Sequence, residues 1–207
     1  SKGDGYCDYL EALWNGWSKA FENPELPFYI VQLAPYGGYG NPPDRYCEIR
    51  TAQERFAQDH AYAGIIPTVD VGEQDNIHPC RKRTVAMRLA AMALNRDYGR
   101  KDIPCECPKV VSCRAQGDAV LISFEHVRAW SRCGDEQPGE FEVAGTNGVF
   151  KAATVEYGKG TLKVLSKEVE RPKAVRYLWN WHLAGKLKSE CGLPVPPFCI
   201  NVQDDVQ

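Results

Sequence analysis

The sequence predicts a mixed fold, with an α/β unit in the first half and an antiparallel β-sandwich in the second. In the first half, stretches with helical spacing of apolar residues alternate with short apolar segments typical of buried strands. Beyond Asp102 the helical spacing disappears, and short strand-like segments recur about every ten residues. The chain has 43% hydrophobic and 25% charged residues, as is ordinary for a globular protein that buries its own core.

Five elements are predicted in the first half. Apolar residues spaced three and four apart from Tyr6 to Phe21 predict an amphipathic helix, which Asp4 caps. The other four elements are a strand over Phe28–Leu33, a helix over 46–57, a strand over 63–71 and a helix over 81–98. This alternation is typical of a parallel sheet covered by helices. Three helices around two strands form an incomplete layer arrangement, so we expect further strands upstream of Ser1.

The second half is predicted to form six short strands separated by turns such as Gln116–Asp118. Their spacing favours an antiparallel β-sandwich. We therefore predict two domains, over residues 1–102 and 105–207, with the boundary near Asp102–Pro108. The expected strands are 109–113, 119–124, 141–144, 150–155, 161–165 and 174–177.

Charge and cysteine patterns exclude several functional classes. The net charge is −2 and the longest basic run is Arg81–Arg83, so we expect neither a nucleic-acid partner nor a membrane partner. The nine cysteines are irregularly spaced. Cys105 and Cys107, with Cys113, lack the paired CxxC knuckles and neighbouring histidines of a zinc site, so we predict no metal and no cofactor. Free thiols with one or two disulfides, within the second domain if the protein is exported, are expected instead.

The loop after the second predicted strand carries the best candidate for catalysis. Ligand crevices of open α/β sheets lie beyond the carboxyl ends of the strands. In this loop Asp75 precedes His78 by three residues, a spacing that lets the carboxylate orient one imidazole nitrogen while the other faces the crevice. A serine hydrolase needs this pair as orienting acid and general base. Alone the motif is weak, because an Asp-x-x-His pair also arises by chance.

Several longer blocks of the sequence carry more information than the motif alone. They are Phe28–Pro35, Ile49–Glu54, Thr68–Pro79, Phe141–Gly145, Pro172–Trp179 and Gly192–Phe198. Through these blocks, almost the whole chain resembles the sialate O-acetylesterase family of SGNH hydrolases, in the family's order. The resemblance implies the C-terminal part of an SGNH-hydrolase (flavodoxin-like) three-layer domain followed by the β-sandwich. It also implies that Asp75 and His78 are the acid and base of a catalytic triad.

The nucleophile of that family has no counterpart here. Its serine lies far upstream in a glycine-glutamine-serine-asparagine type block, with an oxyanion-hole Gly and Asn, and none of these can be matched. No serine of this chain follows a glycine or stands in a nucleophile turn. We therefore expect an upstream segment, of the same precursor or a second chain, to supply the serine. Cys80, beside the basic run, is a minor alternative nucleophile without precedent in the family. The serines are Ser1, Ser18, Ser112, Ser123, Ser131, Ser166 and Ser189.

Aromatic residues near the predicted site suggest where a sugar would bind. Tyr36 and Tyr39, in the glycine-rich loop after the first strand, are candidate substrate-binding residues. The stretch Trp179–Leu183 is either core packing or a stacking platform for sugars. We expect Glu73 to be solvated. The residues expected to be structural are Gln32, His60, Asp70, His126 and His182.

The predicted activity is removal of O-acetyl groups from sialic acid or a related acetylated sugar, by a Ser-His-Asp mechanism completed upstream. By the resemblance, such an enzyme is secreted, periplasmic or lysosomal. The alternative is a catalytically incomplete carbohydrate-binding fragment or subunit.

Overall fold

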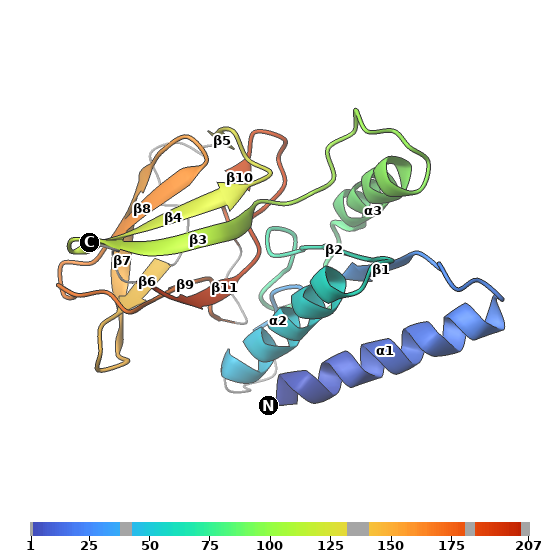
Figure 1. The fold of residues 1–207 in the computed structure, drawn as a ribbon, viewed down its shortest axis with the longest axis horizontal. Helices are drawn as coiled ribbons and strands as arrows, with labels where there is room; N and C mark the ends of the chain where they lie inside the picture. The colour runs from blue at the N-terminus through green and yellow to red at the C-terminus, as the bar shows by residue number, and fades with distance from the viewer. Residues whose placement is uncertain (1, 38–42, 132–140, 181–184, 204–207) are drawn as a thin grey trace. The chain divides into compact units, whose positions relative to one another are not determined.

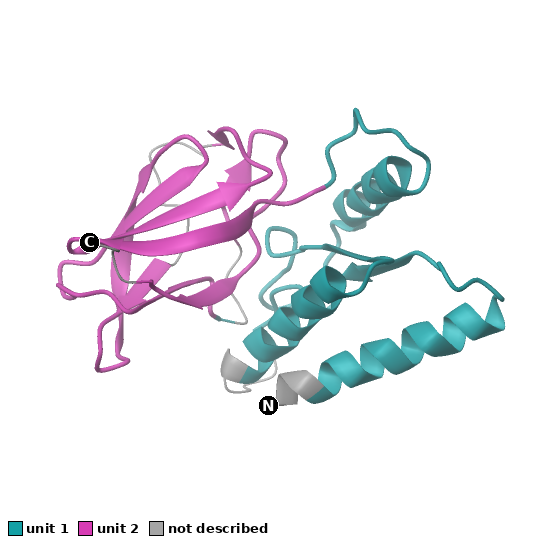
Figure 2. Cartoon of the chain, in the orientation of Figure 1, with its two compact units in different colours: residues 1–105, 180–183 teal, residues 106–179, 184–207 magenta. Residues whose placement is uncertain are grey.

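The computed structural model describes residues 2–37, 43–131, 141–180 and 185–203. The chain divides into two compact units, one of residues 1–105 with 180–183, the other of residues 106–179 with 184–207 (Figure 2). The return of Asn180 to the first unit is a feature that the sequence pattern does not predict. None of the described helices is long and apolar enough to cross a membrane.

The first unit is a short parallel α/β arrangement (Figure 1). Its strands β1 and β2 pair in parallel, with Phe28 opposite Ala63 and Val31 opposite Ile66. The three predicted helices and two predicted strands are all present. In chain order the elements are α1 (Lys2–Ala20), β1 (Phe28–Val31), α2 (Pro43–Asp59), β2 (Ala63–Ile66) and α3 (Lys82–Arg96).

The second predicted strand ends earlier than expected. It was predicted over 63–71, but β2 ends at Ile66. Pro67 follows Ile66 directly, and a proline with its fixed φ is consistent with the end of the strand at this point. Beyond it the backbone N–H of Val71 donates to the carbonyl of Thr68 in a turn. Val69 and Val71 are nevertheless buried, so the apolar pattern identified buried residues correctly but not their backbone conformation.

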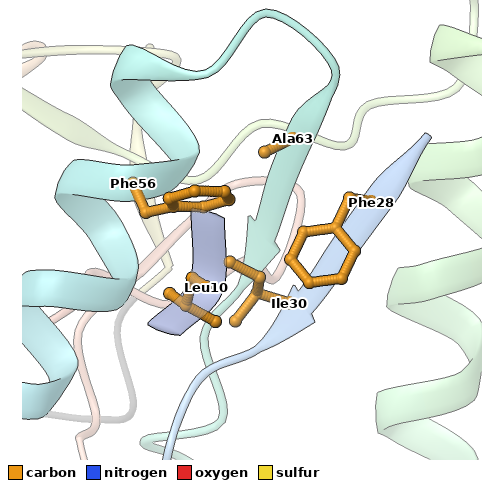
Figure 3. Close-up of a cluster of buried hydrophobic side chains, with 5 residues drawn as sticks. All are labelled: Leu10, Phe28, Ile30, Phe56 and Ala63. Atoms are coloured by element: carbon orange, nitrogen blue, oxygen red, sulfur yellow. The ribbon is translucent and has the colours of Figure 1, made fainter. Parts of the chain in front are cut away.

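Side chains of the two strands alternate between two apolar clusters. In one, Phe28 and Ile30 of β1 and Ala63 of β2 pack against Leu10 of α1 and Phe56 of α2 (Figure 3). In the other, Ile66 packs with Met92 of α3 and with Cys105. The period of two in the strands therefore separates the side chains that meet α1 and α2 from those that meet α3.

The second unit is a seven-stranded antiparallel sheet nearly closed into a barrel, which corrects the predicted sandwich. The strand order is β11-β9-β6-β7-β8-β4-β3. Gln203, just after β11, exchanges backbone hydrogen bonds with Cys113 and Ala115 of β3, which brings the two ends of the sheet together. The strands are β3 (Lys109–Gln116), β4 (Ala119–Glu125), β6 (Phe141–Ala144), β7 (Phe150–Tyr157), β8 (Thr161–Leu165), β9 (Ala174–Tyr177) and β11 (Phe198–Asn201).

All six strands predicted for this unit are present, and three more were missed. Two of the missed strands, β5 (Trp130–Ser131) and β10 (Lys188–Ser189), are two residues long and pair with each other. The third is β11, which follows a proline-rich stretch that masks its alternation. No disulfide joins the eight described cysteines, so the expected bridges are absent from the part of the chain that the structure describes. Cys133 lies outside the described residues.

Candidate functional site

The segment that leads from β2 into the candidate loop is fixed by two side chains. The Thr68 hydroxyl donates to the backbone carbonyl of Gln32, at the end of β1, over 2.6 Å. The Arg88 guanidinium of α3 binds both carboxylate oxygens of Asp70 at 2.8 and 2.7 Å, and also donates to the carbonyl of Pro67 at 2.8 Å. Asp70 is therefore structural, as predicted, and it anchors the residues immediately before the loop.

Side chains of α2 fix the residues that follow β1. Arg50 Nε donates to the carbonyl of Leu33 over 2.8 Å, and Gln53 Oε1 accepts the N–H of the same residue over 3.0 Å. The Tyr46 hydroxyl donates to the carbonyl of Ala34 over 2.5 Å. Three polar side chains on one helix thus hold three consecutive peptide units at the carboxyl end of β1.

The two loops at the carboxyl ends of β1 and β2 are joined to each other. The backbone N–H of Gly37 donates to the carbonyl of Gln74 over 2.7 Å. Gly72 lies against Pro35 so closely that a Cβ at this glycine would stand 2.6 Å from the Pro35 carbonyl oxygen. A residue without a side chain is needed here for the loops to meet.

Glu73 organises the loop itself. Its carboxylate accepts the backbone N–H of Cys80 at 2.6 Å and the side-chain amide of Asn76 at 3.0 Å. Asn76 Oδ1 in turn accepts the backbone N–H of His78 at 2.9 Å. The pKa of Glu73 is lowered below its ordinary value, because hydrogen bonds to the ionised carboxylate stabilise it. The bond from the Cys80 N–H is the largest cause, and the bond from the Asn76 amide is the next. The prediction that Glu73 is merely solvated was therefore incomplete.

Asp75 and His78, the predicted acid and base, lie in this organised loop and both side chains are exposed. Among the residues that the structure describes, no hydrogen bond or ion pair joins the two side chains. Catalytic hydrogen bonds are often long in a free enzyme and tighten when substrate binds. Their assignment as acid and base stays a prediction.

The predicted sugar-binding residues lie partly within the described chain. Tyr36 is half-buried and precedes Gly37, whose N–H is bonded to the loop that carries His78. Tyr39 lies outside the described residues, as do residues 181–183 of the aromatic stretch. Trp179 is half-buried in the second unit.

Within the described residues of the first unit, neither a serine free to act as nucleophile nor a metal cluster accompanies the candidate loop. In the described part of the first unit the one serine is Ser18, which is buried at the end of α1 and donates to the carbonyl of Asn23 over 2.7 Å. The thiol of Cys80 is exposed. Across the described residues no group of three His, Cys, Asp or Glu side chains is placed to hold a metal ion.

Of the four histidines, His60 is structural, as predicted. Its ring packs against those of Trp14 at 4.3 Å and Phe56 at 5.1 Å. His126 is exposed, and its Nε2 lies 3.7 Å from Oε1 of Glu125. His182 lies outside the described residues.

Arg50 supports the backbone of the candidate site, and the sequence analysis did not single it out. Its side chain is 1% exposed, and Nη1 donates to the carbonyl of Asn180, 130 residues along the chain, over 2.8 Å. Burial lowers its pKa, because desolvation disfavours the charged guanidinium. Among the described residues its Nη2 and the Oε1 of Gln32 are buried without a hydrogen-bond partner. The available signal was the position of Arg50 on the buried stripe of α2, with Cys47 and Phe56.

The fold of this chain is similar to that of a carbohydrate acetylesterase from Xanthomonas citri. The crystal structure of that protein matches with a TM-score of 0.85 and 27% sequence identity. The match covers 96% of this chain and 46% of that chain, so this chain spans less than half the length of the protein it resembles. No family model matches the sequence, and no curated protein matches it either.

Proposed function

We propose that this chain forms part of a carbohydrate esterase that removes acetyl groups from sugar hydroxyls. The observation that carries the proposal is the structural match to a carbohydrate acetylesterase over 96% of this chain. The geometry is compatible with it, since the loops after β1 and β2 meet through Gly37 and Gln74 and place Tyr36 and His78 on joined segments. We further propose sialic acid, or a related acetylated sugar, as the substrate, and a secreted, periplasmic or lysosomal location. The sequence blocks that resemble those of sialate O-acetylesterases support both.

In the proposed mechanism His78 is the general base and then the general acid. It takes the proton from a serine hydroxyl as the serine attacks the acetyl carbonyl, and it returns that proton to the sugar oxygen as the carbon–oxygen ester bond breaks. Asp75 holds the imidazole in the required orientation and stabilises its positive charge. Water then hydrolyses the acetyl-serine by the same proton route and releases acetate. The serine and its oxyanion hole come from a segment upstream of Ser1, and Tyr36 and Tyr39 contact the sugar ring.

The test is release of acetate from an O-acetylated sugar by this chain alone and by the chain with its upstream segment. The chain alone should be inert, because a triad without its nucleophile and oxyanion hole loses orders of magnitude in rate. In the completed enzyme His78→Ala should abolish measurable acetate release, with a loss in kcat above about 10⁴-fold, whereas Asp75→Asn should leave a small residual rate. His126→Ala is the matched control, because that histidine is also exposed and lies in the other unit. Equal rates for the two histidine variants would refute the proposed base.

A second candidate is a carbohydrate-binding part that performs no chemistry itself. The absence of a bond between Asp75 and His78 in the described structure, and the engagement of Ser18 by Asn23, favour it. It predicts that an acetylated sugar binds the chain but that acetate is never released, even with the upstream segment present. Calorimetric titration together with the acetate assay separates the two functions.

A further inference from the structure

We propose that Glu73 is a positioning residue for His78, and that it acts through the side-chain amide of Asn76. The inference rests on the proposed function, in which His78 is the general base. It goes further in naming the residue that holds the base in place, the atoms through which it acts, and the property of its carboxylate on which the loop depends.

Three hydrogen bonds connect the backbone around His78 to one carboxylate. The backbone N–H of His78 donates to Oδ1 of Asn76 over 2.9 Å, and Nδ2 of Asn76 donates to Oε2 of Glu73 over 3.0 Å. The other carboxylate oxygen, Oε1, accepts the backbone N–H of Cys80 over 2.6 Å. Glu73 therefore holds two backbone N–H groups, that of Cys80 directly and that of His78 through Asn76.

The order of donors and acceptors in this network requires a carboxylate at position 73. A backbone N–H can only donate, so Asn76 turns its oxygen to His78 and its NH2 group to Glu73. An ionised carboxylate only accepts, and it meets the two incoming donors with one oxygen each. A glutamine would offer one oxygen to two donors, and its own NH2 group would face one of them. The carboxylate thus fixes the orientation of the Asn76 amide, and with it the backbone of His78.

Exposure distinguishes this carboxylate from the one proposed for catalysis. Glu73 and Asn76 are half-buried, whereas Asp75 and His78 are exposed. Among the described residues no hydrogen bond joins the side chains of Asp75 and His78, so the contact that places the base is made by its backbone. Hydrogen bonds to an ionised acceptor are shorter and stronger than neutral ones, and the 2.6 Å bond from Cys80 is of this kind.

Fixing the backbone of a general base should affect the rate more than substrate binding. A base acts within about 2.6–3.2 Å of the proton that it removes, and a misplacement of about 1 Å can cost about 100-fold in rate. The bond from the Gly37 N–H to the Gln74 carbonyl does not involve the Glu73 carboxylate, so the loop of Tyr36 stays joined without it. Loss of the network should therefore lower kcat about 10- to 100-fold and leave KM nearly unchanged.

The experiment exchanges the polarity of the pair formed by Glu73 and Asn76. Glu73→Gln leaves one incoming donor facing an NH2 group, and Asn76→Asp sets two carboxylates against each other. The double variant restores all three bonds. Its carboxylate at position 76 accepts the His78 N–H and the NH2 group at position 73, while the oxygen at position 73 accepts the Cys80 N–H. In this chain completed by its upstream segment, each single variant should lose kcat, and the double variant should recover most of it.

A second measurement uses this chain alone and needs no activity. Hydrogen exchange of the His78 and Cys80 amides is followed by NMR in the wild type and in the three variants. The His78 amide should exchange at least about tenfold faster in Glu73→Gln and in Asn76→Asp than in the wild type. Both amides should return to the slow rate in the double variant.

The matched control is Glu190→Gln. The Glu190 carboxylate also accepts backbone N–H groups, at 3.1 Å, but it lies in the second unit. This variant should leave kcat and the His78 amide unchanged. If Glu73→Gln fails to fold, Asn76→Ala removes the same link to His78, and it should lower kcat and speed exchange of the His78 amide to the same extent.

The outcomes separate the positioning role from the proposed function. If the completed wild-type enzyme releases no acetate while the amides respond as expected, the proposed function is wrong and the hold of Glu73 on the His78 backbone is supported. If the wild type releases acetate and Glu73→Gln keeps its kcat, the function stands and the positioning role is overturned. A loss of kcat that the double variant does not recover shows that Glu73 does not act through Asn76, which also overturns the inference. So does a rise in KM at constant kcat, which would place Glu73 in substrate binding.

Discussion

The buried ion pair between Arg88 and Asp70 should be the most sensitive polar contact of the α/β unit. The two side chains are 7% and 4% exposed, and the guanidinium makes two hydrogen bonds to the carboxylate and one to the Pro67 carbonyl. Asp70→Ala leaves a buried guanidinium without its counter-charge. Removing one partner of a buried pair typically costs about 3–5 kcal/mol.

The matched control is an exposed pair of the same chemistry. Arg100 and Asp102 also form two guanidinium–carboxylate bonds, at 2.9 and 2.8 Å, but are 58% and 66% exposed. Solvent screens such a pair, so Asp102→Ala should destabilise the unit far less than Asp70→Ala. A double variant, Asp70→Leu with Arg88→Met, should recover most of the loss, since apolar replacements of a buried pair are often neutral.

Amide hydrogen exchange is the suitable assay, because the protein has two compact units and a single unfolding transition is not assured. The slowest amides of α3 and β2 should exchange about 150- to 5,000-fold faster in Asp70→Ala, which is the factor that 3–5 kcal/mol represents. The amides of the second unit should change little. If Asp70→Ala and Asp102→Ala had equal effects on α3, the argument from burial would be wrong.

Three further predictions concern the site and the thiols. Gly72→Ala should separate the loops after β1 and β2 and lower stability and acetate release, whereas Gly16→Ala in α1, where nothing lies within 4 Å, should stabilise by about 0.5–1 kcal/mol. Because the folded pKa of Glu73 is lowered, its contribution to stability is present above the ordinary value of 4.5 and is lost as pH falls through the folded value. The Cys80 amide chemical shift should follow that titration in the wild type and stay constant in Glu73→Gln. Burial raises the pKa of Cys113 to about 12, so iodoacetamide at about pH 8 should modify the exposed Cys80 and leave Cys113 unmodified by mass spectrometry.

Periodicity was sufficient to predict which helices and strands form the first unit, but not where β2 ends or how the polar interior is arranged. The spacing of Leu10 and Trp14 predicts α1, because helix formation depends on one apolar face that the sequence displays directly. The burial of Arg50 depends on carbonyls of Leu33 and Asn180, which only the tertiary fold brings to it. Residue spacing carries no information on such a contact.

In the second unit the predicted strands were correct and their closure was not. The alternation of apolar and polar residues identifies a strand such as β4 from its own sequence. Whether the strands form a sandwich or a barrel depends instead on which distant strands pair. Here the decisive contacts are those of Gln203 with β3. Likewise, Asp75 and His78 are close in sequence and share a loop, but their spacing alone could not determine whether their side chains are bonded.

The hydrogen bonds made by Arg50 and Tyr46 indicate why α2 carries polar side chains on its inner face. Among the described residues the Nη2 donor of Arg50 is buried without a partner, which costs about 1–3 kcal/mol, and an apolar residue on the same stripe would avoid that cost. The guanidinium of Arg50 instead fixes the position of the backbone, because it binds the Leu33 carbonyl. Tyr46 fixes the Ala34 carbonyl in the same way. Those residues lead into the segment whose Gly37 is bonded to Gln74, in the loop that carries the proposed base. The buried polar residues of α2 therefore lower the stability of the fold, but they fix the backbone that leads into the proposed site. The side chains proposed for chemistry stay exposed at the surface.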